Sequence, residues 1–146
     1  MTTPPLRQFD AGLDAFDELR AYVERFCADA GIDQRTLAVL ILICEELFEN
    51  SRLHGYQAAA AASAGQLVWL GLAVAGDCID MVYEDAAPAY NPFAHASAPD
   101  YSGPAETWQV GGLGIPLIMQ LTRNLHYEHT GERNRTRLSV PIAAAD

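Results

Sequence analysis

The sequence predicts an α+β sandwich in which one layer of helices lies on one sheet. Two helical segments open the chain, at residues 13–30 and 33–55. Two pairs of strand-like runs follow, and the members of each pair are joined by a short turn. Strands joined by tight turns are antiparallel neighbours, so a doubly wound parallel sheet fits less well.

Composition predicts one soluble globular domain over residues 1–146, because half of the residues are hydrophobic and only 19% are charged. The start of the chain has no basic region followed by an apolar run, and no segment approaches about 18 apolar residues. We therefore expect a cytoplasmic protein that does not associate with a membrane.

The formal charge of −10 opposes binding to DNA or RNA, which normally requires a basic stripe. No nucleic acid is expected as a partner, and a basic protein surface is a more natural one. Cys27, Cys44 and Cys78 form no CxxC pair, so neither a disulfide framework nor a structural zinc site is indicated. We expect buried free thiols.

Both helical segments carry start or stop signals. Apolar residues recur at threes and fours from Leu13 to Phe26, and Gly31 supplies a stop. Asp33 is placed to cap the second helix, and Gly55 is expected just past its end.

The second helix changes from apolar to polar along one sector, which contains Val39, Ile43, Glu46, Asn50 and His54. A carboxylate there can accept a proton or orient water, and an amide oxygen can bind a hard cation. The spacing leaves a second interpretation open, in which these side chains hydrogen-bond loop backbone. For His54, capping or hydrogen bonding is favoured over zinc binding, because no HExxH pattern is present.

The strand-like runs cover residues 66–75 and 78–84, with Gly76 and Asp77 as a hairpin turn between them. Residues 85–114 form a long stretch rich in Pro, Gly, Ala and Ser, which is typical of a functional loop. A short helix at 115–124 and a second hairpin, with runs at 125–130 and 135–142, complete the prediction.

"EELFENSRLHGY" resembles the N box of the GHKL ATPases, the group of gyrase, Hsp90, histidine kinases and MutL. Within that group it is similar to the small anti-sigma-factor serine kinases of bacteria. The residues that match the N box are Glu46, Asn50, His54, Gly55 and Tyr56.

Two further boxes follow in the family's order. "DAAPAYNP" resembles the Asp-x-Gly-x-x-Phe-x-Pro box, with Asp85 as the aspartate that binds the adenine amino group. Ala87 replaces the box glycine and Tyr90 the phenylalanine. A methyl group at 87 penalises a positive φ, so we expect reduced nucleotide affinity. "GGLGI" resembles the glycine box that closes over the phosphates, and its residues are Gly111, Gly112, Leu113 and Gly114.

The resemblance covers residues 13–141 and implies the Bergerat fold, with helices on one face of a mixed, largely antiparallel sheet. It implies ATP and Mg²⁺ as cofactors. Asn50 would hold the metal, Glu46 would act as base on water or a serine hydroxyl, and Asp85 would read adenine. Thr136 would lie near adenine, although a surface strand position is an equal alternative. Residues 93–110 would be the lid.

The standalone length favours the anti-sigma serine kinase group, since too few residues precede Leu13 for the helical hairpin of a histidine kinase. The resemblance implies a kinase that phosphorylates an antagonist protein, sequesters a sigma factor and forms a homodimer. A kinase-dead module that binds partners with or without nucleotide is the alternative. A metal-dependent hydrolase that uses Glu46, His54 and His95 is a third interpretation.

Overall fold

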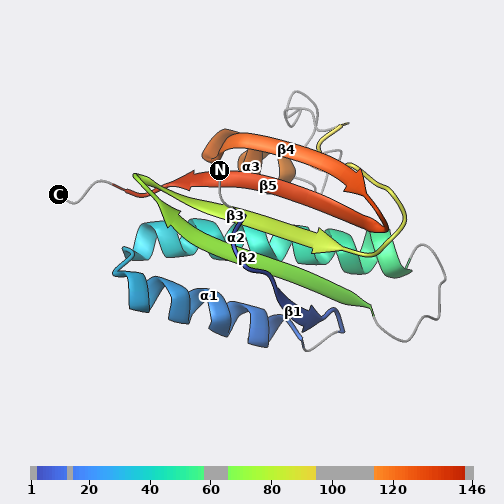
Figure 1. The fold of residues 1–146 in the computed structure, drawn as a ribbon, viewed down its shortest axis with the longest axis horizontal. Helices are drawn as coiled ribbons and strands as arrows, with labels where there is room; N and C mark the ends of the chain where they lie inside the picture. Colours follow the sequence, from blue (N-terminus) through green and yellow to red (C-terminus); the bar gives the residue numbers. More distant parts are fainter. Residues whose placement is uncertain (1–2, 13–14, 58–65, 95–113, 144–146) are drawn as a thin grey trace, which may run out of the picture.

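The computed structural model describes residues 3–12, 15–57, 66–94 and 114–143. Their helices and strands share one sandwich, in which α1, α2 and α3 cover one face of a five-stranded sheet (Figure 1). The elements are β1 (Arg7–Asp10), α1 (Phe16–Ala30), α2 (Gln34–Asn50), the π-helix η1 (Ser51–Gln57), β2 (Leu67–Ala75), β3 (Cys78–Asp85), α3 (Gly114–Leu121), β4 (Arg123–Thr130) and β5 (Arg133–Pro141).

The strand order is β1-β2-β3-β5-β4, and every pairing between the described strands is antiparallel. This confirms the predicted α+β sandwich. Both predicted hairpins are present, and each turns at a glycine in the left-handed region: Gly76 has a φ of 62° and Gly131 a φ of 63°. Glycine adopts this conformation without the steric cost that a Cβ brings.

The caps of the first two helices follow the predicted signals. Gly31 ends α1 in the left-handed conformation with a φ of 68°. The Asp33 side chain accepts a hydrogen bond from the backbone N–H of Thr36 at 3.0 Å and thereby caps α2. Since α2 lies against both α1 and α3, this cap sets the start of the central helix of the layer.

The structure corrects two predicted helix ends and adds one strand. The second helix was predicted to end just before Gly55, but the π-helix η1 follows α2 directly and extends to Gln57. The third helix ends at Leu121 rather than at 124, and Asn124 has a φ of 57° inside β4. Strand β1 was not predicted, since four residues with one buried side chain, that of Phe9, leave almost no alternation to detect.

The core lies between the helices and the sheet. Leu40, Ile43 and Cys44 of α2 are fully buried there and pack against strand residues of the same cluster. Those strand residues alternate along β2, β3 and β5 and comprise Val68, Leu70, Leu72, Ile79, Met81, Tyr83, Leu138 and Val140.

The face of the sheet opposite the helices is partly covered by the N-terminal residues. A Cβ added at Gly71 would lie 2.9 Å from the carbonyl oxygen of Pro5 and 3.0 Å from that of Pro4, so the backbone passes directly over β2. Nη2 of Arg137 on β5 donates to the Thr3 hydroxyl at 3.1 Å. Three polar strand residues on this face, Asp80, Glu84 and Ser139, are buried.

In the described part of the chain, no helix is long and apolar enough to cross a bilayer. The three cysteines are free, and Cys27 and Cys44 are buried as expected. Cys78 is half-buried at the start of β3, so the expectation of three buried thiols is wrong at this position.

Candidate functional site

A pocket lies where the C-terminal end of α2 meets the end of β3 and the start of β5. The cavity between these elements has a volume of about 30 Å³, and it opens to solvent. The walls are formed by Leu47, Asn50, Ser51 and Gly55 from α2 and η1, by Tyr83, Asp85, Ala87, Pro88, Tyr90 and Pro92 from β3 and the segment after it, and by Tyr127, Asn134 and Thr136 from β4 and β5.

Asp85 is the buried acid of this pocket, with 9% of its surface exposed. Its Oδ2 accepts a hydrogen bond from the Ser51 hydroxyl at 2.6 Å. Its Oδ1 accepts from the backbone N–H of Ala87 at 3.1 Å and from Nδ2 of Asn134 at 2.8 Å. A carboxylate offers about four acceptor positions, so three are filled and one is left for a hydrogen-bond donor of a ligand.

Tyr83 extends this hydrogen-bond network through Ser51. Its hydroxyl lies 2.8 Å from the Ser51 hydroxyl, and both side chains are buried. Because Ser51 gives its proton to Asp85, the phenol of Tyr83 is the donor to Ser51. Burial raises the pKa of Tyr83 well above its ordinary value, which keeps the phenol protonated for that role.

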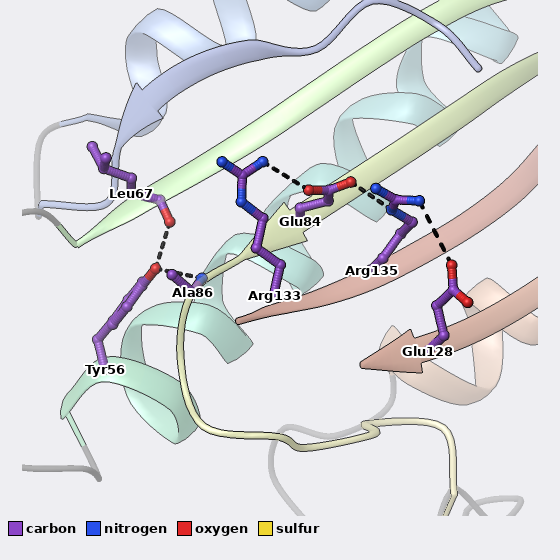
Figure 2. A network of polar contacts seen from close by, with 7 residues as sticks. All are labelled: Tyr56, Leu67, Glu84, Ala86, Glu128, Arg133 and Arg135. Carbon is purple, nitrogen blue, oxygen red and sulfur yellow. Dashed lines mark hydrogen bonds and ion pairs between the residues drawn. The ribbon is translucent and has the colours of Figure 1, made fainter. Parts of the chain in front are cut away.

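Residues of η1 hold the end of β3 at successive positions. Ser51 bonds to Asp85, and the Tyr56 hydroxyl accepts from the N–H of Ala86 at 2.7 Å while donating to the carbonyl of Leu67 at 2.6 Å (Figure 2). A Cβ added at Gly55 would lie 2.7 Å from the Cβ of Ala87. The N-box segment and the segment after β3 therefore fit together as one unit.

The expected strain at Ala87 is not found. Among the described residues, Asn124 is the non-glycine residue with a positive φ, so the backbone at Ala87 does not need glycine. The methyl group of Ala87 is 3% exposed and lies against Gly55 in the core cluster. The expectation of a positive φ at position 87 is therefore wrong, and the missing side chain at 55 leaves room for the methyl group. The effect of Ala87 on nucleotide affinity stays a prediction.

Asn50 lines the pocket at the last position of α2 and is half-buried. Its Nδ2 atom is buried without a hydrogen-bond partner among the described residues. The oxygen and nitrogen of an amide are assigned from the surrounding network, and here no partner fixes that choice. An amide with unused capacity facing a pocket fits a ligand of a hard cation, which prefers oxygen.

Glu46 lies one turn before Asn50 and beside the pocket rather than in its lining. A Cβ added at Gly114, the first residue of α3, would stand 1.9 Å from Cδ of Glu46. Burial raises the pKa of Glu46, and the negative charges of Glu45 and Glu49 raise it further. The carboxyl group is therefore a stronger base than an exposed glutamate.

Thr136 and Tyr90 both line the pocket. Thr136 is 5% exposed, so it is a pocket residue and not a surface strand residue. Tyr90 is 47% exposed and sits at the rim. His54 belongs to η1, but its side chain lies outside the described part of the structure. His95, the glycine-box residues Gly111, Gly112 and Leu113, and most of the expected lid also lie outside it.

Four polar pocket residues were not predicted from the sequence: Ser51, Tyr83, Tyr127 and Asn134. A signal for Asn134 exists in the run RNRTRLSVP, where alternation places Asn134 and Thr136 on the same face as Leu138 and Val140. Two polar residues at the head of a core-facing row indicate a buried polar site. Within the described residues, no three His, Cys, Asp or Glu side chains cluster as a metal site made by protein alone.

The histidine kinase-like ATPase domain family matches residues 9–140 of the sequence. The chain belongs to this family. The match to the histidine kinase-like ATPase domain includes α2, β3 and β5, each of which contributes residues to the pocket. No curated protein sequence matches the chain.

Among solved structures, the chain is similar to the RsbU and RsbW domains of Rv1364c from Mycobacterium tuberculosis, with a TM-score of 0.63 and 21% sequence identity. The similarity covers 99% of this chain and 34% of that one. The chain thus spans about a third of the chain in that structure, and the likeness shows the same fold.

Proposed function

We propose that this chain is an ATP-dependent serine/threonine protein kinase of the anti-sigma-factor type. The observation that carries the proposal is the placement of Asn50 and Asp85 in the lining of one pocket, with Glu46 one helical turn away beside the first residue of α3. The proposed metal ligand, the proposed acceptor for the adenine amino group and the proposed basic carboxylate thus come from α2 and the end of β3.

Asp85 would read the adenine amino group, since its remaining acceptor position can receive an N–H donor. Thr136, Ala87 and Tyr90 border the same space and would surround the base. Asn50 would hold Mg²⁺, which when bound neutralises charge on the phosphates. The glycine box, which ends at Gly114, would lie over those phosphates.

Glu46 would act as the general base. In the transfer step, the substrate hydroxyl oxygen forms a bond to the γ-phosphorus, its proton passes to Glu46, and the bond to the β-phosphate oxygen breaks to release ADP. The raised pKa of Glu46 suits this role, because a base is most effective when its pKa approaches the working pH.

The proposed substrate is a small antagonist protein, and the proposed consequence is partner switching that controls a sigma factor in the cytoplasm. The named RsbW domain of the similar structure supports this choice. The acidic charge of −10 favours partners with basic surfaces. We also propose a homodimer, because the resemblance of the sequence to the anti-sigma-factor kinases implies one.

The test is incubation of the purified chain with labelled ATP, Mg²⁺ and the antagonist-type protein encoded nearest to it. Label should appear on a serine or threonine of that protein. Glu46→Ala should abolish transfer while it leaves ATP binding intact, and Asn50→Ala should remove the Mg²⁺ dependence of binding. Transfer retained in the Glu46 variant would exclude the base assignment.

A kinase-dead interaction module is the second candidate, and the three donors that already occupy Asp85 favour it. The two candidates differ in thermal stability, because a ligand that binds only the folded state must raise the melting temperature. Absence of a shift at millimolar ATP with Mg²⁺ would support the nucleotide-free module.

A further inference from the structure

We infer that Asn134 is a positioning residue of the nucleotide pocket. Its side chain holds the Asp85 carboxylate and the segment after β3 in the arrangement that binds adenine. The inference rests on the proposed function and adds a residue for which the sequence motifs give no role. Asn134 lies at the second position of β5, directly opposite Asp85 in the antiparallel register.

The carboxamide of Asn134 contacts four residues of the adjoining segment, and 8% of the residue is exposed. The two N–H groups of its Nδ2 are shared among three acceptors: Oδ1 of Asp85 at 2.8 Å, the carbonyl of Ala87 at 3.0 Å and the carbonyl of Pro88 at 3.1 Å. Its Oδ1 accepts from the backbone N–H of Tyr90 at 3.0 Å. The side chain of Asn134 thus binds the segment 85–90 at both of its ends.

Tyr127 of β4 completes the arrangement. Its hydroxyl donates to Oδ1 of Asn134 and also accepts from the N–H of Tyr90 at 3.1 Å. All three side chains, those of Asp85, Asn134 and Tyr127, line the pocket. The contacts of Asn134 therefore determine the shape of the pocket wall.

An amide is the group that this position needs. The partners of Nδ2 are all acceptors, and the partners of Oδ1 are all donors, so a side chain with both functions is required. An ionised carboxylate at 134 would turn an oxygen toward Asp85 and two carbonyls. Two carboxylates at this separation cannot both ionise without cost, so they share a proton and the pKa of one is raised.

The backbone of Asn134 is fixed from the other face of the sheet. Its neighbours Arg133 and Arg135 both bind the carboxylate of Glu84, at 3.0 and 2.6 Å, and Arg135 also lies 3.6 Å from Glu128 (Figure 2). These contacts pin β5 to β3 beside the pair formed by Asp85 and Asn134. They therefore hold the side chain of Asn134 opposite Asp85.

The experiment is calorimetric titration of the full chain with ATP and Mg²⁺ between pH 5 and pH 8, for the wild type, Asn134→Asp and Asn134→Ala. At pH 8, Asn134→Asp should weaken binding by at least about tenfold, since a buried donor is lost and a like charge is added. As the pH falls, affinity relative to the wild type should recover, because the shared proton restores a hydrogen bond to Asp85. Asn134→Ala should lose affinity without such recovery.

Two further variants keep the test decisive. Asn124→Asp adds the same charge at an exposed position and should bind ATP like the wild type at every pH. Tyr127→Phe removes only the hydroxyl that contacts Asn134 and should weaken binding by about threefold to tenfold, even if the Asn134 variants do not fold.

The outcomes separate the two proposals. If the wild type binds ATP and the folded Asn134 variants bind it equally well, the role of Asn134 is overturned and the proposed function stands. If the Asn134 variants do not fold, unchanged affinity in Tyr127→Phe leads to the same conclusion. Loss without acid recovery in Asn134→Asp would show a merely structural residue and also overturn it. A wild type that does not bind ATP would overturn both.

Discussion

Gly114 lies so close to Glu46 that an added methyl group would stand 1.9 Å from Cδ and 2.3 Å from Oε2 of its carboxyl group. The first residue of α3 therefore packs directly against the side chain of the proposed catalytic base. The absent side chain at 114 lets the carboxyl group occupy its position at the end of the expected phosphate-binding box.

Gly114→Ala is expected to displace the Glu46 carboxyl group and reduce phosphotransfer by about 100-fold, the scale of losing a positioned base. The free energy of unfolding should change by less than about 1 kcal/mol, since the obstructed atoms are the end of a flexible side chain and alanine suits a helix. Labelled-ATP transfer and urea denaturation measure the two quantities. Gly12→Ala is the control, because its Cβ would meet only Oδ1 of Asp10, at 3.5 Å.

The raised pKa of Glu46 predicts the acid limb of the pH–rate profile. Burial is the larger cause, and the charges of Glu45 and Glu49 add to it, so activity should fall with acid at a pH above the ordinary value of 4.5. Glu45→Gln and Glu49→Gln should each move this limb to lower pH. Glu24→Gln, which removes an exposed charge on α1, should leave the limb in place. A limb that does not respond to charge at 45 or 49 would contradict the role of Glu46.

The same pKa predicts a stability effect of defined sign. A glutamate whose pKa is raised by folding contributes full stability below the unfolded pKa, and this contribution is lost as the pH rises through the folded pKa. Glu46→Gln should therefore be more stable than the wild type at pH 7 and equal to it near pH 4. Urea denaturation at both pH values measures the difference, and greater stability of the variant at pH 4 alone would have the wrong sign.

The sequence predicted the parts of the fold that depend on local pattern. The apolar stripe of α2, its cap at Asp33 and the glycine turns of both hairpins follow from spacing and from single residues with strong preferences. Strand β1 was missed because its hydrogen bonds to β2 depend on tertiary pairing rather than on its own pattern.

The candidate site divides in the same way. Glu46, Asn50 and Asp85 stand in recognisable motifs, whereas Ser51 and Asn134 gain their roles only when β3, β5 and η1 are brought together. The room for the methyl group of Ala87 likewise depends on Gly55, a contact that appears only in the folded chain.

Gly55 and Ala87 should behave as a coupled pair. Gly55→Ala would place two methyl carbons 2.7 Å apart, and it should lower the free energy of unfolding by about 1–3 kcal/mol, the usual cost of overpacking. Ala87→Gly alone should cost about 1 kcal/mol through a lost buried methyl and added backbone freedom. In the double variant the methyl group changes sides, so the two costs should not add. Denaturant unfolding of all four proteins gives the coupling energy, and simple additivity would contradict the close contact.

Glu84→Gln should destabilise the fold more than the loss of an exposed ion pair. Glu84 is fully buried and binds two guanidinium groups, but Arg133 and Arg135 have 41% and 28% of their side chains exposed, so water can solvate them once the carboxylate is gone. We expect a loss of about 2 kcal/mol, below the range for breaking a fully buried pair. Arg123→Gln, which removes an exposed partner of Asp77, should cost less than about 0.5 kcal/mol. Equal losses in the two variants would mean that burial gives the Glu84 cluster no added strength, and β3 and β5 would then be held in register by backbone pairing alone.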